Sequence, residues 1–127
     1  MKYLIDSYAW IEYIDGSVAG EKVMKILNEN HEIFSLSLII SEVVSRTKRK
    51  NMNAETAYKA IISNSKIVQI TPEIAKETGI FHANIRNKMR DFGLVDSFIY
   101  VIAKKLNAKI LTGDGHFRKF KEAVMIK

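Results

Sequence analysis

The chain has 127 residues, of which 47% are hydrophobic and 27% charged, a composition ordinary for a globular protein of one domain. Lysine and arginine outnumber aspartate and glutamate by 20 to 14, and the resulting charge of +6 favours polyanionic partners such as RNA or DNA. The absence of cysteine excludes disulfides and thiolate metal sites, and no stretch predicts a signal peptide or membrane span, so we expect a cytoplasmic protein.

Short apolar runs alternate with helix-capping residues along the first half of the chain. Residues 2–5 predict a buried strand, and the segment after Asp6 predicts a helix that ends at Gly16. Ser17 is placed to cap a second helix, "VAGEKVMKILNEN". The next predicted elements are a strand over 32–36, a helix over about 38–49 capped by Ser37, the helix "AETAYKAIISN" capped by Asn53, and a strand over 66–70.

The second half continues the alternation of helices and strands. Thr71 and Pro72 predict the N-cap and first position of a long helix, "PEIAKETGIFHANIRNKMR". Gly93 separates it from the helix "LVDSFIYVIAKKLN", and strands are predicted over 108–112 and 123–126. This order predicts an α/β fold, a three-layer α/β/α arrangement with a central, mostly parallel sheet of four to five strands.

Four acidic residues occupy positions where ligand sites form in such a sheet. Asp6 ends the first strand, and Asp114 follows the fourth in "LTGDGHF". If these strands are neighbours, both acids face the crevice where the strand order reverses. Asp96 falls in the first turn of the helix before the fourth strand, and Glu42 falls early in the helix after the second. Each also has an ordinary interpretation, as a helix cap, an exposed helix residue or a turn residue.

A cluster of these carboxylates requires compensating positive charge. Two carboxylates about 5 Å apart repel by roughly 3 kcal/mol at an effective dielectric of about 20, so four do not all stay ionised without raised pKa values or a cation. Oxygen ligands around an open coordination sphere suit Mg²⁺ or Mn²⁺, which can activate a water for phosphodiester hydrolysis. The three histidines are not spaced as pairs of zinc ligands, so the sequence does not indicate a zinc site. His116 is either a solvated loop residue or a contact to a phosphate.

Three basic clusters accompany the acids, at 46–50, 86–90 and 118–121. They are either RNA-phosphate contacts or solvated helix ends, since cations also favour the last turn of a helix. The RNA-binding residues that we predict from them are Lys48, Arg49, Arg86, Lys88 and Arg90.

The segments "YLIDSYAWIEYI", "SLIISEVVSR" and "GLVDSFIYVIAKKLNAKILTGDGHF", in this order, resemble the PIN-domain family, particularly the VapC-type toxin ribonucleases of toxin–antitoxin pairs. The resemblance implies a single PIN-like nuclease domain over 1–127 that acts as an endoribonuclease. It implies that the catalytic and metal-binding carboxylates are Asp6, Glu42, Asp96 and Asp114. It also gives Ser7 a supporting hydroxyl. Many relatives carry a further acid shortly after the position of Asp114, where this chain has His116.

The same resemblance implies partners. Toxins of this kind form homodimers and are silenced by an antitoxin that covers the early helices. Trp10, Tyr13 and Ile14 are candidates for that surface, and core packing is the other interpretation of all three.

Three alternatives remain open at this point. The first is a housekeeping PIN nuclease in RNA processing or decay that has no antitoxin. The second is a receiver-type phosphoacceptor domain, which requires adjacent acids after the first strand and an aspartate ending the third, where this chain has "IDS" and "QIT". The third is an inactive PIN fold that serves as a binding module, against which the four acids argue.

Overall fold

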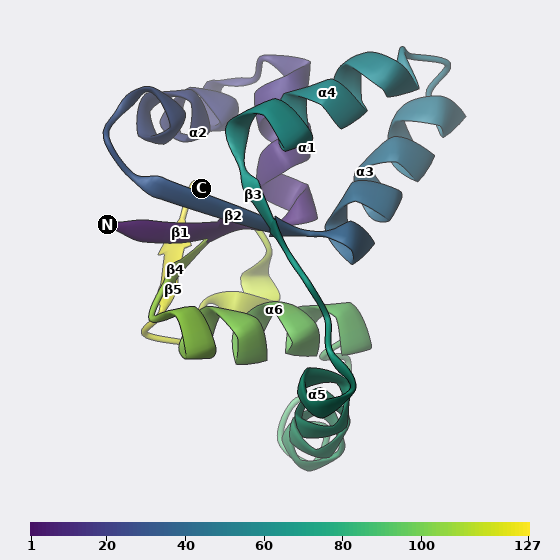
Figure 1. Ribbon diagram of the computed structural model, residues 1–127, viewed down its shortest axis with the longest axis vertical. Helices are drawn as coiled ribbons and strands as arrows, with labels where there is room; N and C mark the ends of the chain where they lie inside the picture. The colour runs from purple at the N-terminus through teal and green to yellow at the C-terminus, as the bar shows by residue number, and fades with distance from the viewer.

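A computed structural model describes residues 1–127 and shows a central sheet with helices on both faces (Figure 1). The strands are β1 (Lys2–Ile5), β2 (Glu32–Leu36), β3 (Lys66–Val68), β4 (Lys109–Thr112) and β5 (Ala123–Met125). Their order is β3-β2-β1-β4-β5, and every neighbouring pair is parallel. The predicted three-layer α/β fold is therefore confirmed, with a sheet that is parallel throughout.

The helices divide between the two faces of the sheet (Figure 1). One layer holds α1 (Ser7–Asp15), α2 (Val18–Asn28), α3 (Ser37–Arg49) and α4 (Ala54–Asn64), and the other holds α5 (Pro72–Ile85) and α6 (Leu94–Leu106). None of these helices combines the length and the apolar character needed to cross a bilayer.

Four of the helices begin at an N-cap residue that the sequence indicates. Asp6 accepts a hydrogen bond from the Ala9 backbone, and Ser17 accepts one from Gly20. Asn53 and Thr71 cap α4 and α5 in the same way. The caps satisfy backbone N–H groups that the first turn of a helix leaves without partners, which is why these residues locate the helix starts.

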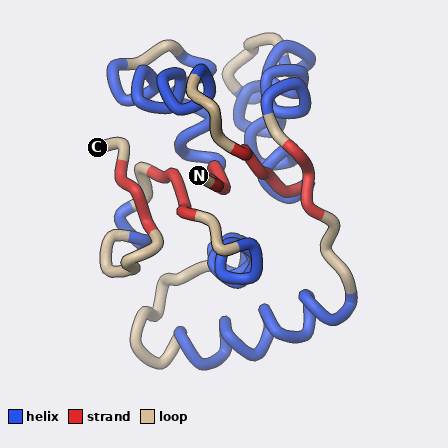
Figure 2. Tube along the Cα trace, turned by 60° about the vertical axis from the view of Figure 1, so that its left-hand side comes forward, coloured by secondary structure: helices blue, strands red, loops and turns tan.

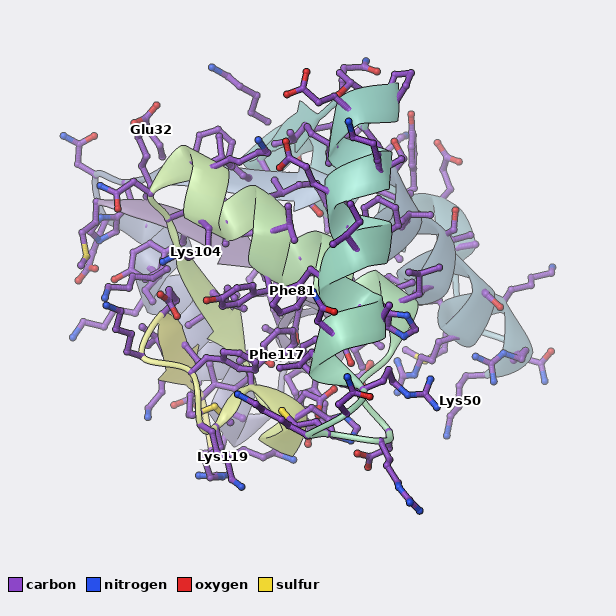
Figure 3. All side chains as sticks on the ribbon, turned by 90° about the horizontal axis from the view of Figure 1, so that it is seen from below. Glu32, Lys50, Phe81, Lys104, Phe117 and Lys119 are labelled. Atoms are coloured by element: carbon purple, nitrogen blue, oxygen red, sulfur yellow. The ribbon has the colours of Figure 1, made fainter.

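The core lies between the sheet and its two helical layers. Leu4 and Ile5 of the central strand β1 are fully buried and belong to a cluster of 20 buried hydrophobic residues. Phe81 and Phe117 point inward between α5, α6 and the sheet, whereas Lys50 and Lys119 point outward (Figure 3). Trp10, a candidate for an antitoxin-binding surface, is fully buried in this core, so it offers no surface to a partner.

The structure corrects the predicted end of α5. The sequence predicts that this helix continues to residue 90, but it ends at Ile85, and residues 86–93 form turns that lead to α6 (Figure 2). Phe92 is fully buried and contacts Phe81 and Phe117 edge-on. The turns after Ile85 thus carry Phe92 into the core, where it packs against these aromatic rings.

Smaller differences concern caps and strand lengths. Ser37 is the first residue of α3 rather than its cap, and Leu36 precedes it without a side-chain cap. The third strand ends at Val68 instead of residue 70. A short 3₁₀ helix, η1 (Gly115–Phe117), follows β4 and was not predicted.

Candidate active site

The first and fourth strands are hydrogen-bonded neighbours, as the predicted site requires. Ile5 is in register with Leu111, and the Asp6 N–H donates to the Leu111 carbonyl at 3.2 Å. The strand order reverses between β1 and β4, which is where parallel sheets form ligand-binding crevices. A cavity of about 430 Å³ at this edge is lined by all four predicted acids, Asp6, Glu42, Asp96 and Asp114, together with Ser7.

Asp6 is the most buried member of the group, with 3% of its surface exposed. Its Oδ1 accepts from the Ala9 N–H at 2.9 Å, and its Oδ2 accepts from the Thr112 hydroxyl. Burial raises the pKa of Asp6 to about 7, and the charges of Asp114 and Asp96 add to the rise, while both hydrogen bonds oppose it. An ionised Asp6 is therefore costly unless positive charge lies nearby.

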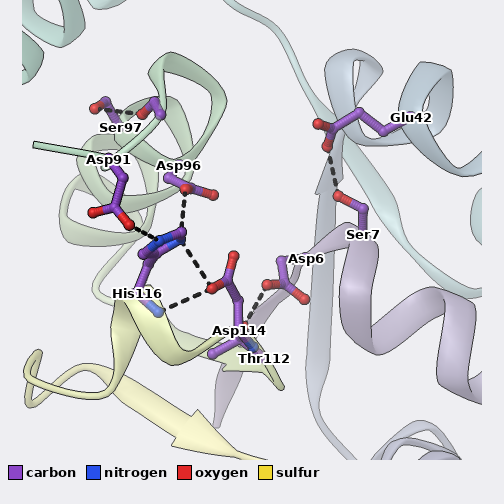
Figure 4. A network of polar contacts seen from close by, with 10 residues as sticks. Asp6, Ser7, Glu42, Asp91, Asp96, Ser97, Thr112, Asp114 and His116 are labelled. Atoms are coloured by element: carbon purple, nitrogen blue, oxygen red, sulfur yellow. Dashed lines mark hydrogen bonds and ion pairs between the residues drawn. The ribbon is translucent and has the colours of Figure 1, made fainter.

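Asp114 belongs to a turn that is tied to Asp6 through one hydroxyl. Thr112 donates to Asp6 and accepts from the Asp114 backbone N–H at 2.9 Å. Asp114 in turn accepts from the His116 N–H at 2.9 Å and caps η1. This chain of hydrogen bonds fixes the two acids relative to each other (Figure 4).

Asp96 and Glu42 face the cavity from opposite helical layers. The pKa of Asp96 is raised to about 6, mainly by burial and in part by the charges of Asp114 and Glu42. Glu42 is exposed and accepts a hydrogen bond from the Ser7 hydroxyl at 2.5 Å. Ser7 is the first residue of α1, and its hydroxyl therefore links this helix to the Glu42 carboxylate on α3.

The predicted basic residues are only partly at the cavity. Arg49 lines it, as does Arg46, whose guanidinium binds both carboxylate oxygens of Asp15 at 2.9 and 2.7 Å. Arg46 was not selected from the sequence, although its spacing from Glu42 and Arg49 places all three on one face of a helix. The cavity lining does not include Lys48, Arg86, Lys88 or Arg90.

Sequence reasoning left the role of His116 open and missed Asp91. The His116 Nε2 atom lies 2.9 Å from Asp91 Oδ2, and its Nδ1 atom lies 3.1 Å from Asp114 Oδ1 (Figure 4). The hydrogen bond with Asp91 raises the pKa of His116 and lowers the pKa of Asp91. Nothing in the sequence indicates that residue 91, in the turns before α6, meets residue 116.

The donor atoms at this edge fit a divalent cation. One atom from each of Asp96, Asp114 and His116 lies within 4.8 Å of the other two. The buried carboxyl of Asp6 faces the same cavity. Several carboxylates that resist ionisation together, beside a nitrogen donor, form a set that a divalent ion stabilises.

The fold and the cavity together define an α/β protein with an acidic site at the switch point of a parallel sheet. The model of the PIN domain matches residues 3–123, and the chain belongs to the PIN-domain family. A comparison with curated proteins finds no match.

Solved structures with similar folds include bacterial toxins and toxin–antitoxin complexes. A toxin–antitoxin complex from Klebsiella pneumoniae has a chain 17% identical, with a TM-score of 0.74 and 98% of both chains covered. VapBC2 from Rickettsia felis, bound to a promoter DNA fragment, is 18% identical with a TM-score of 0.74, covering 98% of this chain and 97% of that one. VapC20 from Mycobacterium tuberculosis, a toxin that cleaves the sarcin–ricin loop, is 13% identical with a TM-score of 0.73, covering 91% and 92%. At these identities the likeness is one of fold.

Proposed function

We propose that this chain is a single PIN nuclease domain that hydrolyses RNA phosphodiester bonds with Mg²⁺ or Mn²⁺, and that it is the toxin of a type II toxin–antitoxin pair. The observation that carries the proposal is the buried carboxyl of Asp6, grouped with Glu42, Asp96 and Asp114 around one cavity. A protein that placed these acids together for stability alone would gain nothing from the charge repulsion.

The four acids would act as the metal-binding and catalytic carboxylates. A bound divalent cation supplies positive charge that lowers the pKa of a water and offsets the charge of the reacting phosphate. Thr112 holds the Asp6 carboxylate in one orientation, and Ser7 does the same for Glu42. These hydroxyls keep the oxygens aimed at the cavity before substrate arrives.

Substrate would be held by the arginines on α3. Arg46 is fixed by Asp15, while Arg49 has no carboxylate partner and is free to contact a phosphate. Lys48 on the same helix, and Arg86, Lys88 and Arg90 in the turns before α6, would extend a basic path for RNA outside the cavity.

Antitoxin pairing is supported by the structural neighbours, several of which are toxin–antitoxin assemblies. By the same analogy the chain would be a homodimer in the cytoplasm. A housekeeping PIN nuclease and an inactive PIN fold that serves as a binding module remain alternatives. A small adjacent reading frame encoding a DNA-binding partner distinguishes the toxin from the housekeeping nuclease, and a cleavage assay distinguishes both from the inactive fold. Co-expression with that partner is expected to suppress cleavage by the toxin.

The enzymatic proposal is tested with labelled single-stranded RNA and purified protein. We expect cleavage with Mg²⁺ or Mn²⁺, none in EDTA, and recovery when the metal is restored in excess. The Asp6→Asn variant, purified in parallel, is the control for contaminating nuclease and is expected to be inactive. Cleavage by the variant equal to that of wild type would indicate a contaminating nuclease. No cleavage by wild type with either metal, or cleavage that persists in EDTA and is absent from the variant, would rule the proposal out.

A further inference from the structure

The imidazole of His116 lies among three carboxylates that come from three different segments. Its Nε2 atom is 2.9 Å from Asp91 Oδ2, in the turns before α6. Its Nδ1 atom is 3.1 Å from Asp114 Oδ1 and 3.8 Å from Asp96 Oδ2 (Figure 4). One nitrogen therefore faces a residue outside the cavity, and the other faces two of the proposed metal ligands.

The contact with Asp91 determines which nitrogen has a free lone pair. A carboxylate accepts hydrogen bonds, so Asp91 holds the proton of a neutral His116 on Nε2 and leaves Nδ1 unprotonated. Carboxylates commonly orient metal-binding histidines in this way, through the ring nitrogen that does not bind the metal. Asp91 is thus placed to act as a positioning residue.

The Nδ1 atom is shielded from solvent and has no hydrogen-bond partner. Its separation from Asp114 Oδ1 is short, but the alignment is not that of a hydrogen bond, and this oxygen already accepts from the His116 backbone. A nitrogen lone pair and a carboxylate oxygen at this distance repel each other unless positive charge lies between them. A proton on Nδ1, or a metal cation bound by both atoms, removes that repulsion.

The distances agree with such a cation. Bonds of about 2.1 Å in an octahedral arrangement put adjacent donor atoms about 3 Å apart and opposite donors about 4.2 Å apart. The separations of Nδ1 from Asp114 and Asp96, 3.1 and 3.8 Å, lie within that range.

We infer that His116 Nδ1 is a nitrogen ligand of the divalent cation, that Asp91 orients the ring, and that this ligand makes the site favour Mn²⁺ over Mg²⁺. The inference rests on the proposed metal-dependent function. Mg²⁺ prefers oxygen ligands almost exclusively, whereas Mn²⁺ accepts imidazole more readily, so replacing an acid by a histidine shifts the preference.

Pulsed electron paramagnetic resonance of bound Mn²⁺ tests the ligand directly, because a coordinated imidazole gives a nitrogen hyperfine coupling. The double variant His31→Gln/His82→Gln leaves His116 as the only histidine. We expect the coupling in wild type and in this double variant, and its loss in His116→Gln. Bound Mn²⁺ without nitrogen coupling in the double variant would overturn the inference, even if His116→Gln failed to fold.

Calorimetry tests the preference between metals. In His116→Gln we expect Mn²⁺ affinity to fall by about tenfold or more, with a smaller change for Mg²⁺, because an amide oxygen still suits Mg²⁺. His82→Gln, a half-buried position on α5 outside the cavity lining, is the matched control and should change neither affinity. Asp91→Ala is expected to weaken Mn²⁺ binding about tenfold, and Asp91→Asn, which keeps an acceptor, should recover part of the loss. Equal losses for both metals in His116→Gln would contradict the preference.

The outcomes separate this inference from the function on which it rests. Metal-dependent RNA cleavage with no nitrogen coupling rejects His116 as a ligand and leaves the nuclease in place. Cleavage that needs no metal, in a protein that binds none, rejects both.

Discussion

At the scale of single residues, Asp6 combines a structural and a chemical role. Its carboxylate caps α1 through the Ala9 N–H, which an asparagine side chain does equally well. Its negative charge, by contrast, is held in a buried position beside Asp96 and Asp114. The charge therefore opposes folding, and the proposed metal-binding role would explain why an acid rather than an asparagine occupies the position.

The first prediction concerns the pH dependence of stability in EDTA. Asp6 has a pKa of about 7 in the folded protein and 3.8 when unperturbed, so the folded state holds this proton more tightly than the unfolded chain. The contribution of Asp6 to stability should then decrease as the pH rises from about 4 to about 7 and level off above, and Asp96 adds to this decrease below about pH 6. We expect Asp6→Asn to remove most of this slope.

The same variant should be more stable than wild type near pH 8 in EDTA, by about 1–4 kcal/mol. The upper figure corresponds to the full pKa shift, and local relaxation would reduce it. Urea denaturation of both proteins at pH 5 and pH 8 measures the effect. Identical slopes for the two proteins would mean that Asp6 acts mainly as a helix cap.

A second residue-scale prediction concerns Arg49. If it contacts a phosphate, Arg49→Gln should weaken single-stranded RNA binding and reduce the slope of log K against log salt by about 0.7. Binding is measured by fluorescence anisotropy at several salt concentrations, with Ca²⁺ in place of the catalytic metal. Lys59→Gln on the exposed face of α4 is the control for net charge. If both variants behave alike, Arg49 contributes only to the overall charge.

At the scale of elements, the site depends on how closely α1 packs against α2. A Cβ atom on Gly20 of α2 would overlap the backbone carbonyl of Glu12 in α1. Gly16 ends α1 in the left-handed region, at φ 70°, which lets the chain turn directly into α2. These glycines hold α1, and with it Asp6 and Ser7, against the end of the sheet.

We therefore expect Gly20→Ala to destabilise the protein by about 1–3 kcal/mol, because the clash involves backbone that cannot rotate away. Gly79 in α5 is the matched control, since a Cβ there meets nothing within 4 Å. Gly79→Ala should stabilise the protein by up to about 1 kcal/mol through helix propensity. Thermal or urea denaturation measures both, and a neutral Gly20→Ala would show that the two helices can separate at little cost.

The elements also show where sequence reasoning works and where it stops. Helix starts were predictable because Asp6, Ser17, Asn53 and Thr71 satisfy backbone groups a few residues away. The end of α5 was not predictable from the sequence, because it depends on Phe92 packing into a core built from distant segments. Local hydrogen bonds can be predicted from neighbouring residues, whereas tertiary packing cannot.

At the scale of the whole molecule, the arrangement of the sheet brings distant acids to one edge. The acids could be proposed from the sequence because each follows a strand or lies in the first two turns of a helix at the carboxyl edge. Their convergence required β1 to lie beside β4, which the structure confirms. The contact of Asp91 with His116 could not be predicted from the sequence, since it depends on turns that have no regular sequence pattern. Acids next to or within regular elements were thus predictable, whereas Asp91, inside an irregular segment, was not.

The measurement that tests the central claim most directly is the change in melting temperature when Mn²⁺ or Mg²⁺ is added to wild type and to Asp6→Asn. A ligand that binds only the folded state stabilises it by about 2.7 kcal/mol at 100 times its dissociation constant. We predict a clear increase for wild type, a much smaller one for the variant at the same metal concentration, and RNA cleavage by wild type alone. Equal increases in both proteins, with cleavage retained by Asp6→Asn, would contradict a metal site built around Asp6.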